Sequence, residues 1–518
     1  MVDRKEFERR ALPHAYDVIV YKEAGHYYAK DASGNVICQD SSTSCIKESI
    51  QYIKNKSASF GEGGIVKIAK GSYRVTEPIR FPYGSLFLKV KGSKGTVIVP
   101  SGNINVFDFY VGQDGEAIRY VDIEDLYIEG DINNRTATAF NFDVYDADNK
   151  LRYVALINIR NVVVHGVKRA VYAKNLWMAK FRDFEVQYSG VDVPVIFLDR
   201  STTDMTHDIY FDRVYLEDIT STSSVVYVRE PVFDVVFDNC YIDSYNKAPY
   251  LIYFENWSGR NVVSKCLFAG ASAYAVRVGI HNIVRGNRIT DSKGGVEIGL
   301  HFNIVTDNVI SVDDIGIRGN SGHSLIIANN YIANMNTGIY LDWGSYYSQV
   351  IGNVIRDVKS SGIFVYHSEQ VKIAFNQIRI EVTTAQDAIH IKDPGYNIIE
   401  GNAVSGNLSN SIVEEYSDYN TIINNIVDKP MVIVGSNTVV RNNRGYITEK
   451  SGVAAIPAGS TKTTVSHGLV KAPTKVLITP LNTPPGKLWV ANITATSFDI
   501  VTDTAPTADL NVAWYAEV

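Results

Sequence analysis

An asparagine with a short apolar tail recurs through the second half of the chain at intervals of 21 to 26 residues. The repeated positions are Asn287, Asn308, Asn330, Asn353, Asn376, Asn402 and Asn425. A fixed period in this range indicates one supersecondary unit that is stacked many times. The units are rich in Ile, Val, Tyr and Gly and lack the apolar period of a helix. They therefore predict short strands joined by turns rather than helical hairpins.

A second series runs in step with the asparagines, in which a small residue is followed by alternating apolar positions. It occupies residues 295–298, 316–318, 338–342, 362–366 and 388–392. Because side chains alternate between the two faces of a strand, one residue of each segment should stack inside and the next should point outward. The inward set is Val296, Ile317, Ile339, Ile363 and Ile389, and the outward set is Glu297, Arg318, Tyr340, Phe364 and His390.

The asparagine position extends towards the N-terminus as an apolar position. Its members there are Leu126, Val162, Phe184, Val214, Cys240 and Cys266. Two series that share one period describe one coil of a solenoid with at least two strands. We therefore predict an all-β, parallel β-helix fold, in which the asparagines lie inside a turn and hydrogen-bond to the next amide and to the turn backbone.

The two ends of the chain lack the repeat found in the middle of the sequence. Ile46, Ile50 and Ile53 share one helical face and predict a capping helix over residues 44–57, which would cover the open end of the solenoid. Residues 1–40 are predicted to form a β addition, a hairpin whose turn is residues 31–35. The β-helix should span residues 41–447, and short strands over residues 448–518 predict a small antiparallel sandwich.

Glycine motifs in the first coils carry a family resemblance. They are Gly63-Gly64-Ile65-Val66, Gly71-Ser72-Tyr73 and Gly92-Ser93-Lys94-Gly95-Thr96. With the preceding helix, they resemble the start of pectate-lyase-like right-handed parallel β-helix proteins, a group that includes polysaccharide lyases, glycoside hydrolases and viral tailspikes. The resemblance covers residues 40–445 and is specific for the fold rather than for the reaction. It implies a polysaccharide partner and a homotrimer.

The C-terminal segment carries a second resemblance. Thr464-Val465-Ser466-His467-Gly468 and the spacing from Trp489 to Phe498 resemble modules at the ends of viral tail fibres. That resemblance implies trimerisation or attachment to a glycan. An end cap without a further role is the alternative interpretation.

Composition narrows the class of protein. The 518 residues are 45% hydrophobic and 20% charged, with a net charge of −6, and no basic cluster indicates nucleic acid. No apolar run is long enough to span a membrane, and the charged N-terminus shows no signal peptide. The implied location is extracellular or virion-associated. Cys240 and Cys266 should be buried thiols, whereas Cys38 and Cys45 could bridge in an oxidising compartment.

Aligning the coils gives two outward columns on one sheet. The first is Asn141, Tyr172, Phe197, Tyr227, Tyr253, Arg277, Glu297, Arg318, Tyr340, Phe364 and His390. The second is Asp143, Lys174, Asp199, Arg229, Glu255, Gly279, Gly299, Asn320, Asp342, Tyr366 and Lys392. Aromatic rings stack on sugar faces, and carboxylates and guanidinium groups bind hydroxyls. The predicted substrate-binding residues are Asp199, Tyr227, Arg229, Tyr253, Phe364, Tyr366, His390 and Lys392. Packing beneath covering loops is the alternative.

Hydrolysis of a glycoside requires two carboxyl groups roughly 5 Å apart for retention, or roughly 6.5–9.5 Å apart for inversion. The strongest candidates are Glu255, Glu297 and Asp342, supported by Arg277, Arg318 and Tyr340. Glu255 and Glu297 lie two coils apart with Arg277 between them. A solvated ladder of alternating charges explains the same residues without catalysis. The Asp313-Asp314 pair is a further candidate, which turn acidity explains better.

Two other functions remain open. A lyase would need a base and a cation that neutralises a uronate, and Arg277, Arg318, Tyr340, His390 and Lys392 could supply them. No cofactor is predicted for a hydrolase; a lyase could use calcium, although Asp199, Asp204, Asp208 and Asp212 lack the spacing of a calcium loop. No other metal ligand set is seen. The non-enzymatic alternative is a tailspike or adhesin that holds a glycan without cutting it.

Overall fold

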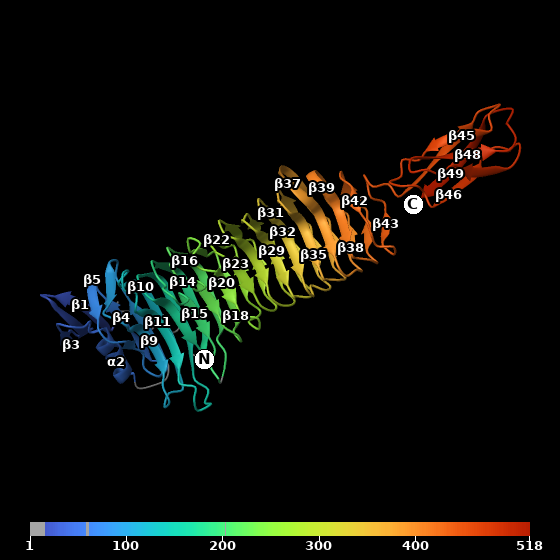
Figure 1. Ribbon diagram of the computed structural model, residues 1–518. Coiled ribbons are helices and arrows are strands. Elements are labelled where there is room, and N and C mark those ends of the chain that lie inside the picture. The colour runs from blue at the N-terminus through green and yellow to red at the C-terminus, as the bar shows by residue number, and fades with distance from the viewer. Residues whose placement is uncertain (1–15, 58–61, 203) are drawn as a thin grey trace. The chain divides into compact units, whose positions relative to one another are not determined.

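The computed structural model describes residues 16–57, 62–202 and 204–518 (Figure 1). The chain divides into two compact units, Met1–Met335 and Asn336–Val518, called unit 1 and unit 2 below. Each is described by itself. The domain boundaries drawn from the sequence at residues 40 and 447 stay predictions.

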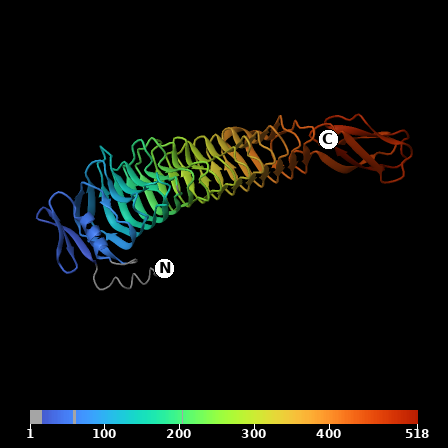
Figure 2. The same ribbon diagram turned by 90° about the horizontal axis from the view of Figure 1, so that it is seen from below.

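Parallel strands in register build the coils of unit 1. The first sheet contains β6 (Ile79–Arg80), β9 (Asn105–Val111), β11 (Thr138–Val144), β13 (Arg169–Lys174), β15 (Ile196–Asp199), β17 (Val226–Val228), β20 (Tyr250–Phe254), β23 (Tyr274–Val278), β26 (Gly294–Ile298) and β29 (Ile315–Asn320). Each strand pairs with the strand one coil later, so the hydrogen-bond ladder runs along the stack (Figure 2).

The other two sheets of unit 1 begin as separate strands, continue as long strands that belong to both sheets, and then divide again. The separate first members are β4 (Gly63–Ile68), β5 (Gly71–Val75), β7 (Gly84–Lys91) and β8 (Thr96–Pro100). The long strands are β10 (Ala117–Glu129), β12 (Tyr153–His165), β14 (Leu176–Gln187) and β16 (His207–Glu217). One branch continues as β18 (Phe233–Asp238), β21 (Val262–Ser264), β24 (Ile283–Arg285), β27 (Ile304–Thr306) and β30 (Ile326–Ala328). The other contains β19 (Tyr241–Asp243), β22 (Leu267–Ala269), β25 (Arg288–Thr290), β28 (Val309–Ile310) and β31 (Tyr331–Ala333).

A left-handed residue marks the bend between these two sheets. Asn161, Asp183, Asn239 and Asp307 have φ between 50° and 58° at equivalent places in their coils. Asn and Asp tolerate this region better than other side chains. The residue that follows the bend points inward, and there the predicted stack is confirmed: Val162 pairs with Phe184 and Phe184 with Val214.

The amides at this inward position form the predicted ladder. Asn287 donates from Nδ2 to Asn308 Oδ1 at 2.9 Å, and Asn308 donates to Asn330 in the same way at 2.9 Å. Each Oδ1 also accepts the backbone N–H of the preceding asparagine, so the buried amides satisfy one another. A second ladder, which was not among the predicted positions, runs through Asn261, Asn282 and Asn303.

The N-terminal end differs from the prediction in its turns. β1 (Val18–Glu23), β2 (His26–Asp31) and β3 (Val36–Asp40) are antiparallel, so two hairpins replace the single one expected. The missed turn is at Ala24 and Gly25, both with positive φ, which Gly adopts without strain. The expected turn at residues 31–35 joins β2 to β3. Residues 1–15 of the predicted β addition lie outside the described residues.

The capping helix α2 (Ile46–Lys56) lies beside the first strands of unit 1 and buries Ile46, Ile50 and Ile53 as predicted (Figure 1). Cys38 and Cys45 form a disulfide just before it. Cys240 and Cys266 are free and buried, as expected.

Unit 2 repeats the coil plan. Its first sheet contains β32 (Thr337–Asp342), β35 (Ser361–Tyr366), the later parts of β37 (Gln377–Lys392) and β39 (Ala403–Glu415), and β42 (Met431–Val432). The others contain β33 (Gln349–Ile351), β36 (Lys372–Ala374), β38 (Ile398–Glu400), β40 (Thr421–Ile423) and β43 (Val439–Arg441), with β34 (Val354–Arg356) and β41 (Ile426–Val427). Here the asparagine ladder runs from Asn353 through Asn376, Asn402 and Asn425 to Asn443.

The last strands of unit 2 form the predicted antiparallel sandwich. One sheet has the order β44 (Glu449–Ile456), β49 (Leu510–Glu517) and β46 (Lys475–Pro480). The other has the order β45 (Lys462–Ser466), β48 (Ser497–Thr502) and β47 (Leu488–Ala491). Phe498, Ile500, Val512 and Trp514 pack between the sheets.

Glu124 of β10 is a buried carboxylate for which the structure predicts a large contribution to stability. Lys89, Lys91 and Arg160 contact its oxygens at 2.7, 2.9 and 2.5 Å. Burial alone would raise the pKa of Glu124, but these hydrogen bonds lower it from 4.5 to about 2. A lowered folded-state pKa stabilises the fold above pH 4.5, and this stability is lost as the pH falls towards 2.

Replacing Glu124 by glutamine should therefore cost about 3 kcal/mol of unfolding free energy at neutral pH and much less near pH 2. Urea unfolding at both pH values measures the difference. The exposed Glu129 on the same strand provides the control substitution to glutamine. An equal loss at both pH values would contradict the ionic explanation.

Candidate functional site

The strand register confirms the first outward column predicted from the sequence within unit 1, and it confirms the Lys174–Asp199 step of the second column. In unit 1, Tyr172 pairs with Phe197, Phe197 with Tyr227, and Tyr227 with Tyr253. The column continues from Tyr253 through Arg277 and Glu297 to Arg318. We call the outward side chains of β11, β13, β15, β17, β20, β23, β26 and β29 the front face of unit 1.

Aromatic rings of this face are half-buried and in contact with one another. The ring centroids of Phe197 and Tyr227 are 5.4 Å apart, edge to face, and those of Tyr227 and Tyr253 are 5.1 Å apart and stacked. Arg277 lies over the ring of Tyr253 at 4.7 Å. Such a row offers apolar area together with hydrogen-bonding edges.

Glu297 lies on the front face but is only 8% exposed. Its Oε2 accepts the hydroxyl of Tyr250 at 3.1 Å and lies 3.4 Å from Arg277 Nε. Arg277 also donates to Phe254 O and to Asn256 Oδ1. Burial, followed by the charge of Glu297, raises the pKa of Tyr250 to about 12. The carboxylate is thus part of a packed ion pair.

Glu255 is equally engaged. One of its oxygens accepts the hydroxyl of Tyr227, and the other accepts the backbone N–H of Glu230 at 2.9 Å. Burial, followed by the hydrogen bond from the Tyr227 hydroxyl to Glu255, raises the pKa of Tyr227. Further along the face, Arg318 hydrogen-bonds Tyr274, whose pKa is raised mainly by burial.

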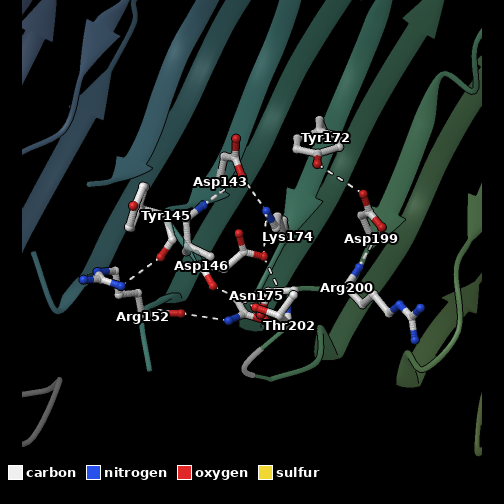
Figure 3. Close-up of polar contacts among 12 residues, drawn as sticks. Asp143, Tyr145, Asp146, Arg152, Tyr172, Lys174, Asn175, Asp199, Arg200 and Thr202 are labelled. Carbon is white, nitrogen blue, oxygen red and sulfur yellow. Dashed lines mark hydrogen bonds and ion pairs between the residues drawn. The ribbon is translucent and has the colours of Figure 1, made fainter. Parts of the chain in front are cut away.

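Asp143, at the end of β11, has a different environment (Figure 3). Its Oδ1 accepts the Val144 N–H at 2.9 Å and lies 3.8 Å from Lys174 Nζ. Burial raises the pKa of Asp143 above its ordinary value; Lys174 and the Val144 N–H oppose this shift, and the charge of Asp146 adds to it. The side chain nevertheless keeps 33% of its area exposed, so a ligand can reach it.

Lys174 is engaged mainly by another carboxylate. Its Nζ lies 3.0 Å from Asp146 Oδ2, which also accepts the Thr202 N–H at 3.2 Å. Burial would raise the pKa of Asp146, but the hydrogen bonds from Lys174 and Thr202 lower it. Because Lys174 is closer to Asp146 than to Asp143, its charge leaves the raised pKa of Asp143 in place.

Asp199 lies two coils from Asp143 in the same column (Figure 3). Its oxygens accept the Tyr172 hydroxyl at 3.2 Å, Arg229 Nη1 at 3.2 Å and the Arg200 N–H at 2.9 Å. Burial and then the charges of Asp199 and Asp143 raise the pKa of Tyr172. At ~4.8 Å per coil, the two carboxyl-bearing residues are ~9.6 Å apart at the backbone.

A buried arginine holds the loop that carries Asp146. Arg152 is 1% exposed and donates to Tyr145 O at 2.9 Å and to Asp148 Oδ2 at 2.7 Å. Asn175 Nδ2 in turn donates to Arg152 O at 2.9 Å. These contacts join the loop to the next coil and keep the surroundings of Asp143 in place.

The corresponding sheet of unit 2 carries the other predicted residues, and we call its outward side the front face of unit 2. Tyr340 stacks on Phe364 at 5.2 Å, and Phe364 contacts His390 edge to face at 4.9 Å. His390 lies 3.0 Å from Asp387 and 3.2 Å from Glu415, and Lys392 lies 2.7 Å from Glu415.

Two further predicted residues of unit 2 belong to this sheet. Tyr366 pairs with Lys392, and Asp342, at the end of β32, is 6% exposed.

Sequence reasoning placed Asp143 and Lys174 in the outward columns without selecting them, and it missed Asp146 and Arg152. The column position was the available signal, whereas burial and loop contacts were not. Among residues 16–57, 62–202 and 204–518, no three His, Cys, Asp or Glu side chains are grouped to hold a metal ion. Asp212 pairs with Arg182 and Arg213 instead.

Residues 250–380 match the family model described as a right-handed beta helix region. The fold of this chain is a right-handed parallel β-helix. Comparison with curated proteins gives no match. Among the helices that the structure describes, none has the length and apolar content that a membrane span requires.

Three solved β-helix proteins illustrate the likeness. The A-module of mannuronan C-5 epimerase AlgE6 from Azotobacter vinelandii is 14% identical, with a TM-score of 0.39, over 77% of this chain and 93% of that one. A tailspike protein of E. coli bacteriophage HK620, in complex with a hexasaccharide, is 12% identical, with a TM-score of 0.40, over 94% and 91%. PfbA, a surface adhesin of Streptococcus pneumoniae, is 12% identical, with a TM-score of 0.37, over 72% and 89%.

Proposed function

We propose that the protein binds a long polysaccharide along the front face of unit 1 and hydrolyses it there. One observation carries this proposal: two carboxyl groups of one column, Asp143 and Asp199, have unlike surroundings. Burial raises the pKa of Asp143, while Asp199 accepts three hydrogen bonds. Pairs of carboxyl groups with separated roles are what glycoside hydrolysis requires.

Asp143 is the proton donor in this proposal. Its raised pKa keeps the carboxyl protonated to a higher pH than that of an ordinary aspartate, and both of its recorded contacts are to Oδ1. Oδ2 can then carry the proton to the glycosidic oxygen as the bond to the sugar carbon breaks. Asp199 removes a proton from the water that attacks the opposite face of that carbon. The proton from Asp143 thus ends on the leaving-group oxygen, and the hydroxyl from the water ends on the sugar carbon.

The backbone spacing predicts the stereochemistry. A separation of ~9.6 Å at two coils suits inversion, for which the carboxyl groups lie roughly 6.5–9.5 Å apart and leave room for the water. Proton NMR of the fresh product would show the inverted anomer. A retained anomer would contradict the assignment of Asp199 as base.

The Glu255–Glu297 pair of unit 1 is the competing site proposal, and Asp342 belongs to unit 2. Arg277, Tyr250, Tyr227 and a backbone N–H contact Glu297 and Glu255, so neither has the surroundings that suit Asp143 to donate a proton, and we assign both to binding. Glu297→Gln should therefore retain cleavage. If Glu297→Gln abolishes turnover and an Asp143 variant does not, the catalytic centre is at Glu255 and Glu297.

The first experiment incubates the protein with neutral and acidic polysaccharides and follows reducing ends and ultraviolet absorbance together. Hydrolysis predicts reducing ends without absorbance. Absorbance that rises with the reducing ends would indicate β-elimination, with Arg277, Arg318, Tyr340, His390 or Lys392 as base or cation and calcium to be tested as cofactor. Tight binding without either signal would indicate an adhesin, the function favoured if the packed ion pairs serve only to hold a glycan.

Tyr253→Ala tests the binding role of the aromatic row. The ring stacks on Tyr227 and under Arg277, and its removal should weaken glycan binding roughly 3- to 10-fold. Isothermal titration with a bound but uncleaved oligosaccharide measures the change. Tyr215→Ala removes a half-exposed ring from another strand, β16, and is the matched control. Equal effects of both variants would indicate a general loss of structure.

The compartment and assembly belong to the same proposal. The Cys38–Cys45 disulfide suits an oxidising environment, which supports action outside the cell or on a virion. The resemblance to tailspikes suggests a homotrimer, which light scattering of the purified protein would test.

A further inference from the structure

An open pocket lies at the end of the front face of unit 2. Its volume is about 800 Å³, within the range of small-molecule sites of roughly 300–1,000 Å³. Asn410, Val413 and Glu415 line it from β39, and Tyr416 and Val434 line it from the loops that follow.

The strand register makes this pocket a continuation of the face. Asn410 pairs with Asp387, Val413 with His390 and Glu415 with Lys392, each one coil further along. A chain lying along Phe364 and His390 would therefore reach the pocket next.

Buried hydrogen bonds build the far wall of the pocket, which is the loop after β42. Glu414 is 1% exposed and accepts the Gly435 N–H at 3.2 Å and the Thr438 hydroxyl at 2.8 Å. Asp418 accepts the N–H and the amide of Asn437 at 2.8 and 2.7 Å. A Cβ at Gly435 would lie 2.5 Å from Thr438 Oγ1. A larger residue at position 435 would therefore clash with Thr438 unless the loop moved.

The lining combines apolar and acidic groups. Tyr416 is 77% exposed and Val434 is 57% exposed, which leaves an aromatic and an aliphatic surface for a ligand. Three carboxylates, Glu414, Glu415 and Asp418, line the pocket. Lys392 and His390 pair with Glu415 beside it, and His390 also pairs with a fourth carboxylate, Asp387. Even with His390 charged, negative charge is in excess, which disfavours a ligand that carries a carboxylate.

We propose that this pocket of unit 2 binds a terminal or branch sugar that lacks a carboxylate, neutral or amino. The proposal rests on the proposed glycan recognition and adds the chemical class of one sugar. Tyr416 stacks on the sugar ring, and the excess of carboxylates excludes a uronate at this position.

Saturation-transfer NMR with the full chain tests it. The probes are glucose, galactose, mannose, rhamnose, N-acetylglucosamine, glucosamine and glucuronate, each at millimolar concentration. At least one carboxylate-free sugar should bind, glucuronate should bind at least 10-fold more weakly, and Tyr416→Ala should lower the affinity roughly 3- to 10-fold. Tyr419→Ala, at a ring that is 51% exposed and lies outside the lining, should leave the affinity unchanged.

Binding led by glucuronate, binding by none of the probes, or equal effects of the two tyrosine variants would each overturn the proposal. Asp143→Asn, a change in unit 1, should leave sugar binding intact. If the protein cleaves polysaccharide but none of the sugars binds the pocket, only the pocket proposal is contradicted. If a sugar binds the pocket but no polysaccharide is cleaved, only the proposed hydrolysis is contradicted.

Discussion

Replacing Asp143 by asparagine is expected to lower kcat for polysaccharide cleavage by about 10²- to 10⁴-fold, the usual contribution of a general acid. Oligosaccharide affinity should change little, because the amide keeps the shape of the side chain. Burial disfavours the charged carboxyl in the folded state, so the neutral amide should leave the unfolding midpoint unchanged or higher. Reducing-end kinetics and thermal unfolding, run on the same preparations, separate the two effects.

The pH profile gives this prediction a second readout. The acid must be protonated to act, so activity is lost as the pH rises through the raised pKa of Asp143, and this limb should be absent from the residual activity of the variant. Asp183→Asn is the matched control. Asp183 lies on β14, outside the front face, and pairs with Arg213. This variant should keep wild-type kinetics. Full activity in the Asp143 variant would remove Asp143 from the mechanism.

Replacing Asn376 by alanine is expected to cost about 3–5 kcal/mol of unfolding free energy. Its Oδ1 accepts the N–H and the amide of Asn353, and its Nδ2 donates to Val350 O and Asn402 Oδ1. The side chain is fully buried, so alanine leaves these groups without water or another partner. Chemical denaturation followed by circular dichroism measures the loss.

Asn407→Ala is the control for this substitution. Asn407 is exposed and its amide makes one long bond, 3.3 Å to Glu381 O, so its loss should stay within about 0.5 kcal/mol. If the two variants unfold alike, the buried ladder does not stabilise unit 2.

The front face could be predicted because periodicity alone sets its register. Once Ile317 and Ile363 are inside, Arg318 and Phe364 must point outward, and the observed pairing of Tyr172, Phe197, Tyr227 and Tyr253 follows the predicted columns. Which carboxyl is chemically distinct could not be read in this way. Glu297 lies in the first outward column and Asp143 in the second, and nothing in these positions distinguishes the two carboxyl groups. Only the surrounding side chains show that Glu297 is in an ion pair and that the pKa of Asp143 is raised.

Features that depend on loops or on contacts between sheets were also beyond the sequence. Arg152 looks like an ordinary charged loop residue until its carbonyl partners are seen. The ladder of Asn261, Asn282 and Asn303 has the same period and the same apolar tail as the predicted one, so this signal was present in the sequence but was not singled out. The turn at Ala24 and Gly25 is only two residues long, so its signal in the sequence is too weak to distinguish it from the strands on either side.

The asparagine ladder also limits how such a chain can evolve. Each amide bonds to the one a coil away, so a deletion that removes one asparagine would interrupt the ladder at that coil. Losing or duplicating a whole coil would instead keep the ladder, the core and both columns in register. The length of the proposed polysaccharide track can therefore change in steps of one coil, with each step gaining or losing one outward row and leaving the other coils in register.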